Sequence, residues 1–139
     1  MIEVRKIKLK EDLEAAFAVR HRVFVVEQEV DPAEEYDEDD EKCTHFLATA
    51  NGIVCGTARW RFKSKGVIKL ERFAVDKEYR SLGIGAALVR AIVKDLPYNK
   101  QVIMHAQLHA IPFYEQLGFK CFGPQFEEAG IQHFAMEMK

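Results

Sequence analysis

The sequence contains no long apolar run, which argues against a transmembrane helix. No stretch of the 139 residues approaches the roughly 18 consecutive apolar residues that such a helix needs. Residues 1–10 alternate charged and aliphatic side chains, so they also lack the apolar centre of a secretory signal peptide. We therefore expect no membrane association and a cytoplasmic location.

Cysteine is scarce, and its spacing matches neither a disulfide framework nor a metal site. Cys43, Cys55 and Cys121 are an odd number without a Cys-x-x-Cys pair. Cys55 and Cys121 lie among apolar neighbours and are expected to be buried free thiols, which suits a reducing cytoplasm. No flanking signature surrounds Cys43 or Cys121, so covalent catalysis through a thiol is disfavoured.

Positive charge is not in excess either. A formal net charge of −2 and a pI near 6.2 argue against a general nucleic-acid binder. The hydrophobic share of 48% and the charged share of 30% are typical of a globular protein. The chain also lacks internal repeats and Ser/Gly-rich linkers, so residues 1–139 are expected to form a single domain.

The most acidic segment, residues 30–42, lacks the glycine of a calcium-binding loop. Asp37, Asp39 and Glu41 follow the alternation of an EF-hand, but Lys42 occupies the place of the glycine that makes the turn. We expect no metal site, and a short helix or a solvated loop instead.

Apolar periodicity predicts the order strand, helix, three strands, helix, strand, helix, strand, strand. Helical spacing marks residues 11–24, 85–96 and 111–117. Strand-like runs occupy residues 4–7, 45–50, 53–62, 66–75, 101–106, 119–122 and 132–138, and Asn51-Gly52 is typical of a tight hairpin turn. Hairpin and helical connections together indicate an α/β (α+β) fold, a mixed central sheet of about six to seven strands flanked by about four helices.

The most informative segment is a turn with two glycines between the strand at 66–75 and the following helix. It reads Arg80-Ser81-Leu82-Gly83-Ile84-Gly85-Ala86. A helix N-terminus exposes unpaired N–H groups that favour an anionic phosphate, and glycines let the backbone approach it. Leu88 stands where a dinucleotide motif has its third glycine, and no lysine follows Gly85 as in a Walker A loop. Glycines that serve packing alone are the alternative.

Arg-x-x-Gly-x-Gly-Ala after a strand resembles the pyrophosphate loop of the GNAT superfamily of N-acetyltransferases. Residues 110–119, Ala-Ile-Pro-Phe-Tyr-Glu-Gln-Leu-Gly-Phe, resemble the second signature of that family and follow the strand at 102–106. Together the two signatures cover about the second half of the chain. Residues 23–28 and 126–133, with Ala106-Gln107, further resemble ElaA-type members. The resemblance implies the GNAT fold and acetyl-coenzyme A (acetyl-CoA) as co-substrate.

The resemblance also implies which residues contact acetyl-CoA. The backbone of residues 73–75 would pair with the pantetheine arm like an added strand, beside a bulge that frees N–H groups for the thioester oxygen. Arg80 and the backbone of residues 81–86 would bind the pyrophosphate. The implied cofactor-binding residues are Phe73, Ala74, Val75, Arg80, Ser81, Gly83, Ile84, Gly85, Ala86 and Gln107. Gln107 departs from the Asn that many relatives carry.

Tyr114 matches the general acid of the family, which protonates the departing thiolate. A phenol is protonated at neutral pH and can donate to sulfur, although a packing tyrosine is the alternative.

For the general base we consider Glu71, whose even spacing from Val75 places both side chains on one face of a strand. Glu27 and His133 are further candidates, and predicted substrate-binding residues, through the ElaA-type resemblance. For each of the three, a structurally paired residue or a water chain is the alternative.

The resemblance therefore implies an N-acetyltransferase that moves an acetyl group to an unidentified primary amine by direct attack in a ternary complex. An acyl-CoA sensor or adaptor without turnover is the alternative. The acceptor would be a small-molecule or peptide amine. The acidic segment would line the acceptor mouth and favour cationic amines, while Arg59 and Arg72 either attract an acidic substrate or pair with that segment. A homodimer through an exposed edge at the C-terminal strand is also considered.

Overall fold

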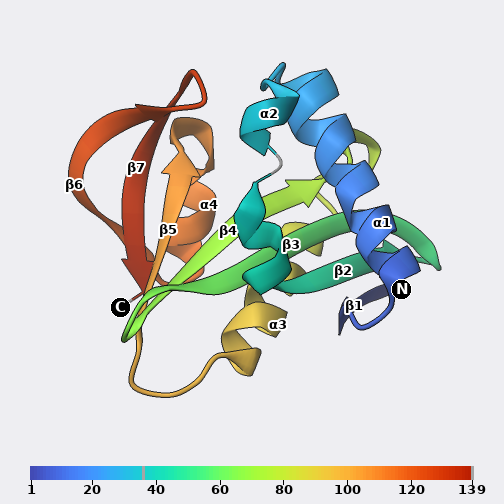
Figure 1. Cartoon of the computed structure of the whole chain (residues 1–139), viewed down its shortest axis with the longest axis horizontal. Coiled ribbons are helices and arrows are strands. Elements are labelled where there is room, and N and C mark those ends of the chain that lie inside the picture. Colours follow the sequence, from blue (N-terminus) through green and yellow to red (C-terminus); the bar gives the residue numbers. More distant parts are fainter. Residues whose placement is uncertain (36, 139) are drawn as a thin grey trace.

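The strands of the chain form one mixed sheet, and helices cover both of its faces (Figure 1). The computed structural model describes residues 1–35 and 37–138. Within them seven strands lie in the order β1-β2-β3-β4-β5-β7-β6. All neighbouring strands are antiparallel except β4 and β5, which are parallel. The predicted fold class and order of elements are confirmed.

The strands are β1 (Ile2–Lys6), β2 (Thr44–Ala50), β3 (Ile53–Ser64), β4 (Val67–Val75), β5 (Gln101–Gln107), β6 (Phe119–Glu128) and β7 (Ile131–Met138). The α-helices are α1 (Lys10–Arg20), α2 (Pro32–Glu35), α3 (Ile84–Asp95) and α4 (Ile111–Gln116). A π-helix, η1 (His21–Glu27), continues α1, and short 3₁₀ turns form η2 (Glu38–Lys42), η3 (Lys77–Tyr79) and η4 (Leu108–Ala110). No helix of these residues is long and apolar enough to span a membrane.

The main hydrophobic core lies between the sheet and α3. Ile84, Leu88 and Ile92 recur at helical spacing, so one side of α3 packs against Ile68 and Leu70 of β4. Each fully buried aliphatic side chain of this kind contributes about 1.5–3 kcal/mol to the free energy of unfolding. Helices α1 and α2 cover the opposite face of the sheet (Figure 1). The two faces of the sheet therefore have different surroundings: α3 packs on one, and α1 and α2 pack on the other.

Two elements differ from their predicted bounds by more than two residues. The predicted helix over residues 11–24 is α-helical only to Arg20, and then widens into η1, where the N–H of Gln28 donates to the carbonyl of Val23 at 3.0 Å. The predicted strand at 119–122 runs on to Glu128. Its register shifts between Phe122 and Phe126, so Gly123-Pro124 forms an irregularity within β6 and not its end.

The order of the strands corrects two expectations about the C-terminal part. The C-terminal strand β7 lies between β5 and β6, so the free sheet edge on that side belongs to β6. An edge strand is covered less than a central one, and Cys121 on β6 is exposed, contrary to prediction. Cys55 on β3 is buried as predicted. All three cysteines are free thiols.

Candidate active site

A slot opens where β4 and β5 separate. The two strands pair only from Val67 and Gln101 to Leu70 and Met104, so residues 71–75 have no partner on β5. The cause is a bulge in β4. Arg72 adopts a left-handed backbone with φ 57°, and the register against β3 shifts beside it. This free backbone includes residues 73–75, which the GNAT resemblance assigns to the pantetheine arm.

All the residues predicted to bind acetyl-CoA or acceptor, or to act in catalysis, line one continuous cavity of about 1350 Å³. The cavity extends from the N-terminus of α3, past Tyr114, to residues of α2, β6 and β7. This volume exceeds the range of roughly 300–1000 Å³ that is common for small-ligand pockets. It provides room for a long cofactor and for an acceptor at the same time.

The turn before α3 needs glycine at two positions for different reasons. Gly83, the residue before α3, has a left-handed backbone with φ 89°, which glycine adopts without strain. Ser81 also has positive φ, 68°, so the backbone curves twice before the helix begins. At Gly85 a Cβ would lie only 3.2 Å from Cζ of Phe113. The first N–H groups of α3 have no intrahelical acceptor, so the turn forms a concave surface suited to a pyrophosphate.

Arg80 and Glu27 form a bidentate ion pair at the rim of the cavity. Both guanidinium–carboxylate distances are 2.6 Å, and Nε of Arg80 also donates to the carbonyl of Val75 at 3.0 Å. The hydrogen bond from Arg80 lowers the pKa of Glu27, which makes that carboxylate a weaker base. The pair holds η1 against the phosphate turn, and we do not assign the base role to Glu27.

Glu71 is unsuited to the base role for which it was considered. The bulge at Arg72 breaks the strict alternation of β4, so the premise of a shared face was wrong. Val75 packs against the α3-side core, whereas Glu71 joins charged groups on the α1 side. Burial alone would raise the pKa of Glu71, but the hydrogen bond from Arg61 and the charges of Arg59 and Lys69 hold it at about 2.

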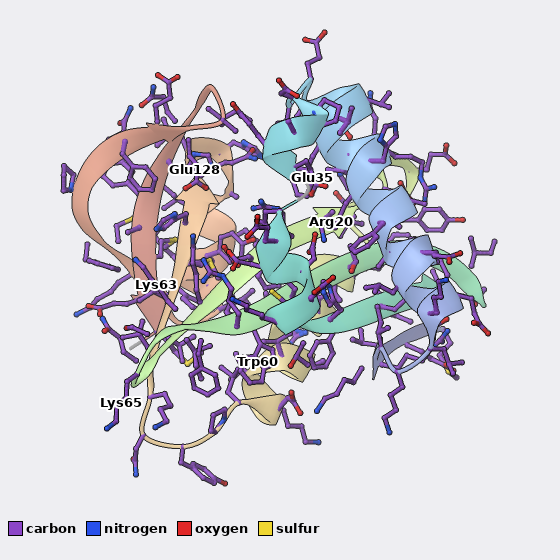
Figure 2. All side chains as sticks on the ribbon, in the orientation of Figure 1. Arg20, Glu35, Trp60, Lys63, Lys65 and Glu128 are labelled. Atoms are coloured by element: carbon purple, nitrogen blue, oxygen red, sulfur yellow. The ribbon has the colours of Figure 1, made fainter. Side chains whose placement is uncertain are left out.

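The acidic segment is folded over the sheet by arginines and is not a solvated loop. Arg20 donates to Glu35 and Asp40, each at 2.7 Å, and Arg59 contacts Asp40 at 2.5 Å and Asp37 at 3.1 Å. Figure 2 shows Arg20 and Glu35 meeting between α1 and the sheet. Both Arg20 and Glu35 are buried. The segment therefore brings few uncompensated carboxylates to the acceptor side.

Arg59 and Arg72 pair with the acidic segment, which was one of their two expected roles. Arg72 lies 3.2 Å from Asp37 and 3.4 Å from Glu35. Because both arginines are engaged inside the protein, they offer little charge to an acidic acceptor. Among residues 1–35 and 37–138, no group of His, Cys, Asp or Glu side chains is placed to hold a metal ion.

Tyr114 lies in α4 on the α3 side of the slot, within an aromatic cluster. Its ring packs edge-on against Phe113 at 5.0 Å, Phe73 at 5.9 Å and Phe119 at 6.2 Å between centroids. Burial raises the pKa of its hydroxyl above the usual range, so the phenol stays protonated at every ordinary assay pH. The proton needed by a general acid is therefore retained.

Gln107 and His133 lie on the opposite side of the sheet, where sequence reasoning missed their partners. The amide of Gln107 donates to that of Gln28 at 3.0 Å. His133 bonds through Nδ1 to the carbonyl of Ile131 at 2.7 Å. Its ring stacks on Phe126 at 5.8 Å. The cofactor contact predicted for Gln107 would require this amide pair to rearrange.

A histidine–carboxylate pair was also missed. Nδ1 of His105 lies 2.9 Å from Oε2 of Glu128, and both residues line the cavity. Alternation along β5 already placed His105 and Gln107 on one face, which was the available signal. Glu128 lay beyond the predicted end of its strand, so nothing in the sequence brought it close to His105.

The sequence profile of the acetyltransferase (GNAT) domain matches residues 10–139. The chain belongs to the GNAT acetyltransferase family. The Bacillus subtilis protein YjcF, described as an uncharacterized N-acetyltransferase, is 38% identical over 132 residues, which span 93% of this chain and 94% of YjcF. The crystal structure of Escherichia coli ElaA superposes with a TM-score of 0.88 at 27% identity over the full length of both chains.

Membership of the GNAT family makes the chain an acetyl-CoA-dependent N-acetyltransferase. A Bacillus subtilis acetyltransferase solved in complex with CoA has the same fold, with a TM-score of 0.74 at 14% identity over 99% of this chain and 98% of that one. The residues of this GNAT chain fit such a co-substrate. The free backbone of β4 and the concave turn at α3 offer donors for its amide-rich arm and its phosphates.

Proposed function

We propose that this GNAT enzyme transfers the acetyl group of acetyl-CoA directly to a primary amine while both substrates are bound. The continuous cavity carries this proposal, because it joins the phosphate turn and Tyr114 to a separate set of polar residues beyond the slot. Its far end is lined by Glu34 of α2 and Ala129 of the β6–β7 turn. An acceptor that enters there would reach the thioester without cofactor release.

Within this proposal the chain positions the thioester and protonates the leaving group. The backbone of residues 73–75 would hold the pantetheine arm, and free N–H groups near the bulge would stabilise negative charge on the thioester oxygen. Arg80 with residues 81–86 would bind the pyrophosphate, in competition with Glu27. Tyr114 would donate its proton to the thiolate.

Direct transfer is favoured over a covalent acetyl-enzyme because no cysteine is in reach of the slot. Cys43, Cys55 and Cys121 all lie within the described residues, and none of them lines the cavity. Burial also raises the pKa of Cys43 to about 11, which disfavours its nucleophilic thiolate. The acceptor is proposed to be a small-molecule or peptide amine, and the cytoplasmic location stays a prediction from the cysteine pattern.

Thiol release from acetyl-CoA across a panel of amines tests transfer. The panel should include polyamines, amino sugars, amino acids and peptides with free N-termini. Acetylated product detected by mass spectrometry, in step with released CoA, is the expected result. Tight binding of acetyl-CoA without turnover on any amine would instead support the sensor or adaptor alternative.

Substitution of Gly83 by Asp tests the phosphate turn. Gly83→Asp places a carboxylate at the α3 N-terminus and a side chain at positive φ, so acetyl-CoA affinity measured by calorimetry should fall at least about tenfold. Gly66→Asp is the matched control, because Gly66 also has positive φ with open space around it but does not line the cavity. Equal affinities of the two variants would contradict the assignment of this turn.

A further inference from the structure

His105 lies where the slot begins, on the face of the sheet opposite Tyr114. It directly follows Met104, the last residue of β5 that pairs with β4. Met104 and Ala106 pack in the α3-side core, so alternation directs the side chain of His105 to the α1 side. Tyr114 belongs to the α3-side core. An imidazole and a phenol therefore reach the same cavity from its two faces.

Glu128 orients the imidazole of His105. It ends β6, beside the upper end of β5 and β7 in Figure 2, and its Oε2 lies 2.9 Å from Nδ1. Phe126, two residues earlier on the same face, packs edge-on against the imidazole at 4.8 Å. The hydrogen bond with His105 lowers the pKa of Glu128, and nearby Lys69 and His133 act in the same direction. The carboxylate is thus ionised at neutral pH.

An ionised carboxylate can only accept a hydrogen bond, so Nδ1 of His105 carries a proton. In the neutral ring Nε2 then holds the free lone pair. No other hydrogen bond to the His105 ring occurs within residues 1–35 and 37–138. A ring nitrogen oriented by a carboxylate through its other nitrogen is the arrangement that a general base requires.

The three candidate bases that the sequence offered are less suited to accept a proton than His105. Glu71 is held ionised by Arg59, Arg61 and Lys69, and Glu27 is occupied by Arg80. His133 is only 6% exposed and its Nδ1 meets a backbone carbonyl, whereas the side chain of His105 is 21% exposed and its Nδ1 meets a carboxylate. Of these four residues, His105 is the best placed to act as the base.

We propose that Nε2 of His105 removes a proton from the acceptor ammonium, with Glu128 as the positioning residue that stabilises the resulting imidazolium. The inference rests on the proposed direct transfer. The nitrogen lone pair that is freed forms the C–N bond at the thioester carbonyl carbon as the C–S bond breaks. Tyr114 protonates sulfur and regains a proton from the new amide nitrogen through solvent. His105 returns its proton to solvent, so each turnover releases one proton.

The pH dependence of kcat/KM for His105→Gln tests the base. Its rate at pH 7 should fall about 10²–10⁴-fold. The deficit should shrink as pH approaches ~10, where a substantial fraction of an alkyl amine is already neutral. Lys69 on β4, Glu71 paired with it, and His133 on β7 are the charged or titratable groups that face the pair, and all are unchanged in this variant. A deficit that is constant with pH would overturn the base role.

Glu128→Gln separates positioning from mere structure. Loss of the carboxylate makes the imidazolium less stable, so the acid limb of the rate profile should move to lower pH as the rate falls. A lower rate with an unmoved acid limb would indicate a structural role only. His21→Gln is a matched substitution of an exposed histidine that does not line the cavity, and it should retain the wild-type profile.

Two measurements keep the base role distinct from the proposed function. Calorimetric affinity for acetyl-CoA and the thermal midpoint of His105→Gln should match wild type, which excludes misfolding. Wild-type protein that releases no thiol with any amine would refute direct transfer itself. Wild-type turnover equalled by His105→Gln at pH 7 would refute only the base.

Discussion

At the scale of single residues, environment decides between side chains that motifs alone rank equally. Tyr114 and Glu71 were both assigned to proton transfer. Tyr114 lies among aromatic rings with burial as the cause of its raised pKa, which preserves a proton to donate. Glu71 lies among three cations, which remove its capacity to accept one. Burial thus supports Tyr114 as a proton donor, whereas the cations around the buried Glu71 make it a poor proton acceptor.

Tyr114→Phe tests the general acid. The substitution removes only the hydroxyl and keeps the ring contacts, so kcat should fall about 10- to 1000-fold while acetyl-CoA affinity stays near wild type. Steady-state kinetics and calorimetry on the same preparation check both parts. Unchanged turnover would return Tyr114 to the packing role that the sequence left open.

At the scale of elements, the bulge in β4 and the arginine cluster set the shape of the site. The bulge at Arg72 separates β4 from β5 and also turns Glu71 away from the face of Val75. Arg20 and Arg59 then hold the acidic segment above the α1-side face, to which Glu71 points. A buried ion pair adds little net stability, because desolvation of its charges costs free energy. Removal of one partner is nevertheless strongly destabilising, because the other charge is left buried and unpaired.

Arg59→Met should therefore lower the free energy of unfolding by about 3–5 kcal/mol, because it leaves Glu71 and its neighbours buried with less compensation. Arg22→Met is the matched control. Arg22 forms a bidentate pair with Asp76 at 2.8 Å but is half exposed, so its loss should cost no more than about 1 kcal/mol. Urea denaturation compares them, and similar losses would argue against the cluster as a structural element.

At the scale of the whole molecule, the cluster links stability to pH. The pKa of Glu71 is about 2 in the folded protein and 4.5 as an ordinary carboxyl. Despite burial, hydrogen bonds and charges from arginines also lower the pKa values of Asp37 and Asp40. A carboxyl with a lowered folded pKa stabilises the protein above its unfolded pKa and loses this contribution as pH falls toward the folded value.

The free energy of unfolding should accordingly decline between about pH 4.5 and 2, with little contribution from these groups to any change between pH 6 and 8. Urea titrations at stepped pH values measure it. Glu71→Gln should have a lower plateau at neutral pH and a shallower acid decline. An acid decline as steep in Glu71→Gln as in wild type would show that other groups cause it.

Sequence reasoning succeeded wherever the evidence was local. Helical spacing located α3 and α4, Asn51-Gly52 located the β2–β3 hairpin, and the glycines at 83 and 85 located the phosphate turn. It failed where an irregularity at one residue changed the direction of the neighbouring side chains or the end of a strand. Arg72 at positive φ inverted the inferred face of Glu71, and the irregularity at Gly123 hid the second half of β6. Arg72 carries no local signal of its positive φ, and the Gly123-Pro124 turn signal is the same whether a strand ends there or continues beyond an irregularity.

The sequence by itself determined the family, the order of elements and the phosphate turn, because periodicity, backbone freedom and helix termini depend on neighbouring residues. Only the tertiary structure decided which carboxylates are neutralised and which histidine is oriented. Arg59 meets Asp37 and His105 meets Glu128 across 22 and 23 residues of chain. Proton affinity follows from such contacts in space, so the chemistry of the site became readable only after strand order and register had brought them together.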